Sequence, residues 1–136
     1  MKPFLGILII GAFLIQTSFG QTEKDISSSI EVAIKVGNAK ELTKLFCNSI
    51  DLNIPGNEGV YSKAQSELIL RDFFTKNNPK SYTTLHKGSS KDGAKYSIGS
   101  LITEKGTYRT YFYMKQKGDS YIIHEFSLNS EEKDRK

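Results

Sequence analysis

The sequence predicts an α+β domain in which three helices from the first half of the chain pack on an antiparallel β-meander from the second half. Before Pro79, apolar residues recur with the three- to four-residue period of amphipathic helices. After Pro79 this period disappears, and the chain becomes rich in Tyr, Thr, Ile and Ser, which favour strands. Short turn sequences such as Asp92-Gly93 interrupt the second half at regular intervals, as expected between neighbouring antiparallel strands.

Residues 1–20 have a different character from the rest of the chain. They contain one charged residue, Lys2, and an apolar run from Phe4 to Ile15, followed by small residues that include Gly20. This is the arrangement of a secretory signal peptide, and the run is shorter than the roughly 20 residues that a transmembrane helix needs. We therefore expect cleavage near Gly20, a periplasmic or secreted protein, and no stable membrane insertion after cleavage.

Residues 21–128 have the length of one domain and contain no internal repeat or low-complexity segment. Residues 129–136 form an expected charged tail, because charges of alternating sign dominate them. The net charge of the whole chain is +4 with both signs mixed, which argues against a nucleic-acid-binding surface. Cys47 is the only cysteine, so an intramolecular disulfide is impossible; a small buried thiol is expected, and pairing between molecules stays open.

Two helices are expected at the start of the domain. The first runs from Asp25 to Val36, with apolar residues spaced for one helix face, and ends at Gly37. Asn38, followed three residues later by Glu41, indicates the N-cap of a second, short helix. The apolar side of this second helix consists of Leu42, Leu45 and Phe46.

A short strand and a longer helix follow. Ser49–Ile54 alternates apolar and polar residues, which predicts a strand that ends at Pro55-Gly56. Ser62 and Gln65 have the spacing of a capping box, so Lys63–Lys76 is expected to be the longest helix. Its apolar face consists of Ala64, Leu68, Ile69, Leu70, Phe73 and Phe74.

Four strands are expected in the second half: Ser81–Gly88, Lys95–Thr103, Gly106–Lys115 and Ser120–Leu128. Alternation in the last two assigns their side chains to opposite faces of the sheet. The set expected to face the helices is Tyr108, Thr110, Phe112, Met114, Ile122, His124, Phe126 and Leu128.

Three segments, Gly59–Phe74, His86–Gly99 and Gly106–Leu128, resemble an uncharacterised exported family typical of Bacteroidetes, the domain of unknown function DUF4783. The order of elements is also similar to that of the nuclear-transport-factor-2-like (cystatin-like) cone. This resemblance implies a bent sheet wrapped around a helix, often with a pocket between them. It implies no catalytic residues, because the family has none that are established. The fold does not indicate an activity either, since the cone hosts isomerases, dehydratases, ligand binders and interaction modules.

A ligand pocket inside such a cone would be formed by inward-facing side chains. The expected pocket residues are Phe73, Tyr82, Tyr108, Phe112, His124 and Phe126. His124 with Tyr108 or Tyr82 is the weak catalytic candidate, because a neutral imidazole beside a tyrosine could move a proton; His86 is also expected to point inward. No acidic residue has a clear inward position beside His124, and a satisfied core or rim histidine is the alternative interpretation.

A stripe of aromatic and basic residues is expected on the opposite face of the sheet. It consists of Arg109, Tyr111, Tyr113 and Lys115. Tyrosine and arginine are enriched at protein interfaces, although ordinary cross-strand stacking also accounts for such a stripe.

Together these patterns predict an exported, non-catalytic binding module. It would bind an unidentified small apolar or amphiphilic ligand in the cone, or an exported protein, or a second copy in a homodimer, on the open sheet face. The alternative is a small isomerase- or hydrolase-like enzyme that uses His124. A third interpretation is a solidly filled cone with only a structural or interaction role. No cofactor is expected, and no metal site either, because His86 and His124 lack a third ligand.

Overall fold

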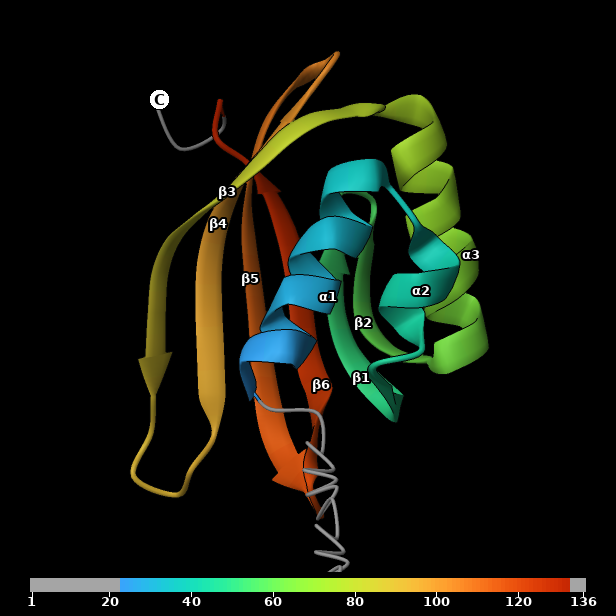
Figure 1. Ribbon diagram of the computed structural model, residues 1–136. Helices are drawn as coiled ribbons and strands as arrows, with labels where there is room; N and C mark the ends of the chain where they lie inside the picture. Colours follow the sequence, from blue (N-terminus) through green and yellow to red (C-terminus); the bar gives the residue numbers. More distant parts are fainter. Residues whose placement is uncertain (1–22, 133–136) are drawn as a thin grey trace, which may run out of the picture.

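Three helices and six strands make up residues 23–132, the part of the chain that the structure, a computed structural model, describes (Figure 1). In chain order they are α1 (Glu23–Val36), α2 (Ala39–Thr43), β1 (Phe46–Ile54), β2 (Asn57–Ser62), α3 (Lys63–Lys76), β3 (Pro79–Ser89), β4 (Lys95–Thr103), β5 (Gly106–Lys117) and β6 (Ser120–Ser130). The predicted signal peptide, residues 1–20, and the end of the predicted tail, residues 133–136, lie outside the described residues.

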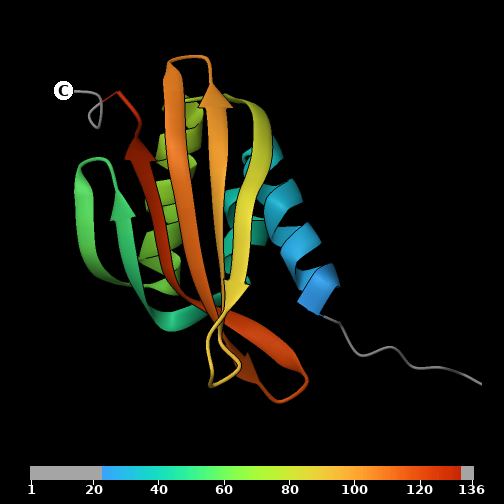
Figure 2. The ribbon, with the colours of Figure 1, turned by 90° about the vertical axis from the view of Figure 1, so that its left-hand side faces the viewer.

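All six strands join in one sheet, in the order β2-β1-β6-β5-β4-β3. Strands that follow each other in the sheet pair antiparallel, except that β1 pairs with β6 in parallel. Helices α1 and α3 contact one face of the sheet, called the inner face here. Figure 2 shows the other, outer face toward the viewer, with the helices behind the strands.

The predicted fold class is confirmed in outline, and two of its details are wrong. The three helices and the strand before the third are present in the predicted order, and β2 is an additional strand between β1 and α3. The sheet has six strands rather than five, and the parallel pair of β1 and β6 means that it is not wholly antiparallel.

Helix α1 forms as its apolar period predicts. Its buried residues are Ile26, Ile30, Ala33 and Ile34. It ends at Gly37, whose φ of +70° suits glycine and whose Cα lies so close to Pro79 that a Cβ would come within 3.2 Å of the proline Cγ. The Asn38 side chain then accepts a hydrogen bond of 3.1 Å from the backbone N–H of Glu41, as the predicted N-cap requires.

The predicted second helix extends to Phe46, and this prediction is wrong. Helix α2 ends at Thr43, and Phe46 starts β1. Phe46 pairs with Ile123 of β6, and its ring centroid lies 5.6 Å from that of Phe126. These contacts join segments far apart in the chain, so the local period around residue 46 does not reveal them.

Strand β2 is not predicted by the sequence pattern. It pairs with β1 from Ile54 opposite Asn57 to Ser49 opposite Ser62, around the predicted turn at Pro55-Gly56. Its side chains are exposed or only partly buried, so they show no strong alternation of apolar and polar residues.

Helix α3 has the bounds that the sequence predicts. Both halves of its capping box are present: the Gln65 N–H donates to Ser62 Oγ at 3.1 Å, and the Ser62 N–H donates to Gln65 Oε1 at 3.0 Å. The residues that it buries are Ser66, Leu70, Phe73 and Phe74. At 14 residues it is as long as α1, and no helix within residues 23–132 is long and apolar enough to cross a membrane.

The four strands of the second half are confirmed, with β4 at the predicted bounds and β6 continuing to Ser130. Three register shifts interrupt the pairing of these four strands. Two lie in β3, between Pro79 and Ser81 and between Thr84 and His86, and the third lies opposite Tyr113 and Met114 of β5, at His124. Such β-bulges add one unpaired residue and bend the strand that carries it.

The core lies between the inner face and the helices. Its largest fully buried side chains include Phe46, Phe112, Phe126, Leu70 and Leu101. The Phe73 ring meets the Tyr108 ring edge to face, with centroids 5.0 Å apart, and so joins α3 to β5.

Candidate functional site

Three of the predicted pocket residues belong to the packed core. Phe73, Phe112 and Phe126 are at most 5% exposed and belong to one continuous cluster of buried apolar residues. A buried aromatic ring in such a cluster contributes packing energy whether or not a ligand binds nearby. Their burial therefore supports the fold and does not itself indicate a ligand.

Tyr82 and Tyr108 point inward, as predicted, and their hydroxyl groups have partners. The Tyr108 hydroxyl donates to Asn77 Oδ1 at 3.0 Å, and the Thr110 hydroxyl donates to the Tyr82 oxygen at 3.2 Å. Burial, reinforced by the charge of Glu31, raises the pKa of Tyr82, and its hydrogen bonds oppose this shift. The Tyr108 hydroxyl thus joins the sheet to the residue that follows α3, and the Tyr82 hydroxyl is held within the sheet.

The predicted inward position of His124 is wrong, because the β-bulge changes the alternation of β6. Glu125 pairs with Tyr113 and Ile123 pairs with Met114, so His124 has no direct partner on β5. Ile123 is buried in place of Ile122 and His124, both of which are partly exposed. The imidazole makes no hydrogen bond with residues 23–132, so the His124–tyrosine pair of the catalytic alternative is not formed there.

The pKa of His124 gives a direct check of this environment. Desolvation, followed by the nearby positive charge of Lys115, lowers it below its ordinary value of 6.5, while Glu125 opposes the shift. We expect an NMR titration of the His124 ring protons to give a pKa below 6.5. The neutral imidazole should therefore stabilise the fold above pH 6.5, and this contribution should be lost as the pH falls through the folded-state pKa. A measured value at or above 6.5 would contradict the described packing.

His86 also lies on the outer face, contrary to its predicted inward position. The shift in β3 places it opposite Ile98, and its Nε2 lies 3.1 Å from the Tyr96 hydroxyl. The Tyr96 ring lies over Gly88, where a Cβ would overlap it, so Gly88 leaves the space that this ring occupies. His86 and Tyr96 therefore form a polar contact on the open side of the sheet.

Two cross-strand rows of side chains extend over the outer face. The Tyr113 row consists of Tyr96, Tyr113, Glu125, Asp51 and Val60. The Tyr111 row consists of His86, Ile98, Tyr111, Ser127, Asn53 and Glu58. Each row crosses neighbouring strands at directly opposed positions, so these side chains form one surface.

Of the predicted stripe, Tyr111 and Tyr113 belong to these rows, and Arg109 and Lys115 flank them on β5. Arg109 and Lys115 are exposed, and the two tyrosines between them are partly exposed. Lys115 Nζ lies 6.0 Å from the centre of the Tyr113 ring, at the outer limit of a cation–π contact. Burial, with the charge of Glu125 in second place, raises the pKa of Tyr111, so its hydroxyl is neutral near pH 7.

An acidic hollow lies beside the stripe, on β6, β1 and β2. It has a volume of about 220 Å³, and its lining residues are Asp51, Asn53, Glu58, Tyr111, Glu125, Phe126 and Ser127. The exposed cations of the stripe thus lie on β5 and the carboxylates on the three strands next to it. The sequence indicates the outward direction of Asp51 and Glu125, but it misses Glu58 because β2 is not predicted.

The remaining candidates for chemistry are metal ligands and the thiol of Cys47. Within residues 23–132, no group of three His, Cys, Asp or Glu side chains lies close enough to hold a metal ion. Cys47 lies on β1 as a free thiol and is partly exposed rather than buried, which departs from the prediction.

The family description "Domain of unknown function (DUF4783)" matches residues 27–129 of this chain. A DUF4783 family protein from Bacteroides uniformis is similar at 26% identity and a TM-score of 0.71, covering 77% of this chain and 96% of that one. One from Bacteroides ovatus is similar at 25% identity and a TM-score of 0.70, covering 76% and 93%.

A more distant structure shares the fold alone. An NTF2-like protein of unknown function from Cytophaga hutchinsonii is 10% identical, with a TM-score of 0.57 over 82% of this chain and 92% of that one. No curated protein matches the chain.

Proposed function

The chain belongs to the DUF4783 family and has the NTF2-like α+β fold, and from this premise we propose that it is a non-catalytic binding module that docks a protein partner on its outer sheet face. The NTF2-like fold is compatible with both catalysis and binding, so the proposed function depends on which side chains the fold exposes. The observation that carries the proposal is the continuous aromatic and charged surface formed by the Tyr111 and Tyr113 rows.

The composition of this surface is suited to protein recognition. Partly exposed tyrosines supply contact area at a small cost in side-chain entropy, and arginine forms several hydrogen bonds at once. Val60 of β2 is 70% exposed and continues the Tyr113 row to the edge of the sheet. A partner that covers these side chains would remove apolar and aromatic area from water, which favours association.

The charges on the outer face define the groups that the partner must present. Carboxylate groups on the partner would meet Arg109 and Lys115 of β5, and a lysine or arginine would enter the hollow lined by Asp51, Glu58 and Glu125. A second copy of this chain satisfies both conditions if its β6 lies over β5 of the first copy. A homodimer and a complex with another protein would therefore use the same groups on this face.

Export is the second part of the proposal. The pattern of residues 1–20, with one lysine followed by an apolar run, supports a periplasmic or secreted location. A partner would then be an exported protein or a second exported copy.

The test is the double variant Arg109→Ala/Tyr111→Ala compared with wild type. Truncated arginine and tyrosine anchors at the centre of an interface commonly cost more than about 1 kcal/mol each, so we expect at least about tenfold weaker association. Light scattering after size exclusion measures self-association, and affinity capture from a host periplasmic extract followed by calorimetry on the captured protein measures hetero-association.

The matched control is Leu68→Ala/Lys76→Ala, which removes an exposed apolar residue and a cation from α3. This variant should associate as wild type does. Circular dichroism spectra and melting curves establish that both variants remain folded. Unchanged self-association and unchanged partner capture in Arg109→Ala/Tyr111→Ala would refute the proposed face.

A further inference from the structure

A second hollow lies among the helices, away from the outer face of the sheet. It has a volume of about 400 Å³, within the range of small-molecule sites. Its lining residues come from the α1–α2 junction, from α3 and from the segment after α3: Val36, Gly37, Asn38, Ala39, Lys40, Arg71, Phe74, Thr75, Asn78 and Pro79. None of these residues belongs to the Tyr111 or Tyr113 row, so the hollow is independent of the proposed partner face.

One side of this hollow is apolar. Val36, at the end of α1, is 63% exposed, and Phe74 and Pro79 lie close to the adjoining Gly37. A Cβ at Gly37 would come within 3.3 Å of Phe74 Cβ as well as near Pro79, so glycine allows the chain to pass closely over these groups. Phe74 is only 5% exposed, so Val36 supplies the apolar surface that stays in contact with water in the absence of a ligand.

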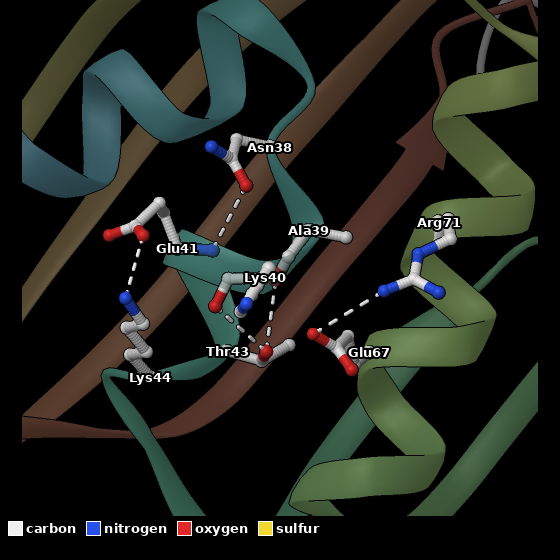
Figure 3. Close-up of polar contacts among 8 residues, drawn as sticks. All are labelled: Asn38, Ala39, Lys40, Glu41, Thr43, Lys44, Glu67 and Arg71. Atoms are coloured by element: carbon white, nitrogen blue, oxygen red, sulfur yellow. Dashed lines mark hydrogen bonds and ion pairs between the residues drawn. The ribbon is translucent and has the colours of Figure 1, made fainter.

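The charged groups of the lining are both positive. Lys40 of α2 and Arg71 of α3 contribute them, and no Asp or Glu belongs to the lining. Figure 3 shows the Arg71 guanidinium directed toward α2, where Lys40 lies. A pair of cations beside apolar surface is complementary to an anion that carries an apolar tail.

Few carboxylates within residues 23–132 compete with such an anion for Lys40 and Arg71. Among the described residues Lys40 makes no ion pair, whereas its neighbour Lys44 is paired with Glu41 at 2.7 Å. Arg71 Nη2 lies 3.5 Å from Glu67 Oε1, a long contact in which 57% of the arginine side chain is exposed. Exposed pairs of this kind contribute little energy, so a bound carboxylate could replace or share this contact.

An apolar extension adjoins the hollow along α1. A neighbouring hollow of about 370 Å³ shares Val36 and Asn38 with the first and reaches Val32, which is 58% exposed. Its lining also includes Glu41, whose carboxylate is paired with Lys44. Val32 and Val36 are four residues apart and therefore lie on one side of the helix. Together they form a continuous apolar surface along α1, against which a short hydrocarbon tail could pack.

We propose that this junction of α1, α2 and α3 binds a small amphiphilic carboxylate, such as a short-chain acyl or aryl acid. The carboxylate lies between Lys40 and Arg71, and the tail lies on Val36 and toward Val32. This placement pairs the charged head with both cations and removes the exposed valines from water.

Octanoate is the probe, with octanol and octylammonium as controls that keep the tail and change the head group. Calorimetry at low salt should detect binding of octanoate and at least about tenfold weaker binding of both controls. Amide shifts in ¹H–¹⁵N NMR spectra should move at Gly37, Asn38, Ala39 and Asn78 and not on β4 or β5. Equal affinity for octanol, no binding of octanoate, or shifts confined to the sheet would each overturn the proposal.

Single variants test the cationic part and the apolar part of the site separately. Lys40→Gln and Arg71→Gln should each weaken octanoate binding roughly five- to tenfold, whereas Lys76→Gln, which removes a cation of α3 outside the lining, should leave it unchanged. Val36→Thr keeps the shape of an exposed residue and should weaken octanoate binding about threefold. A loss of affinity in Lys76→Gln equal to that in Lys40→Gln would mean that only the overall charge attracts octanoate, which would also overturn the proposal.

Discussion

Phe112→Ala is expected to lower the free energy of unfolding by about 3–5 kcal/mol, as large-to-small changes of fully buried aromatic residues do. Phe112 is 0% exposed, lies at the centre of β5, and is paired with Ser97 of β4 and Phe126 of β6. The loss is large relative to the roughly 5–15 kcal/mol that stabilises a typical domain. Equilibrium urea unfolding, followed by circular dichroism, measures it.

Two further variants test whether the loss of stability in Phe112→Ala comes from the cavity that it leaves in the core. Phe112→Leu keeps an apolar side chain in the core and should cost clearly less than Phe112→Ala, because a smaller cavity remains. Gln116→Ala, an exposed change on the same strand, should stay within about 0.5 kcal/mol of wild type. If Phe112→Ala cost less than about 1 kcal/mol, the described core would be wrong at this position.

Gly99→Ala is expected to destabilise the protein by about 1–3 kcal/mol, which is typical of overpacking in a closely packed region. Gly99 lies buried in the middle of β4, between Thr84 and Thr110 on the neighbouring strands. A Cβ there would overlap the Tyr82 side chain and would lie 2.7 Å from its Cε2 atom. Since Tyr82 is held by Thr110, its ring has little freedom to move away.

A double-mutant cycle identifies the cause of this loss. In the Tyr82→Ala background the ring is absent, so Gly99→Ala should become neutral or slightly stabilising, because alanine restricts the unfolded chain more than glycine does. The coupling free energy should then be about 1–3 kcal/mol, measured by urea unfolding of the four proteins. An equal cost of Gly99→Ala in both backgrounds would show that the ring of Tyr82 is not responsible.

The elements whose residues specify them locally are those that the sequence predicts well. Ser62 and Gln65 make their hydrogen bonds within one turn, so the start of α3 is visible in the spacing alone. The turns around β4 are short, and its bounds also agree with the prediction. In contrast, Phe46 becomes part of a strand through pairing with Ile123, and β2 is held by its register with β1. Both depend on partners that a local pattern cannot identify.

In the candidate site too, the sequence predicts the residues that follow a regular local pattern and misses those that depend on an irregularity of the strand. Alternation places Arg109 and Tyr111 on the open face, since β5 keeps one period throughout that stretch. The positions of His86 and His124 result from bulges in β3 and β6, where one extra residue reverses the face to which the adjoining residues of the strand point. No residue type at these positions indicates a bulge, so strict alternation assigns both histidines to the wrong side.

The parallel pair of β1 and β6 has a consequence for how the chain reaches its folded state. Phe46 opposite Ile123 joins the first strand to the last, so during synthesis the hairpin of β1 and β2 cannot pair with the rest of the sheet until β6 is available. Contacts of such long sequence separation slow folding. A chain cut before Ser120 would leave β1 and β5 as open strand edges, and unpaired edges invite aggregation. The final strand is thus the element that converts a hairpin and a separate three-stranded meander into one sheet.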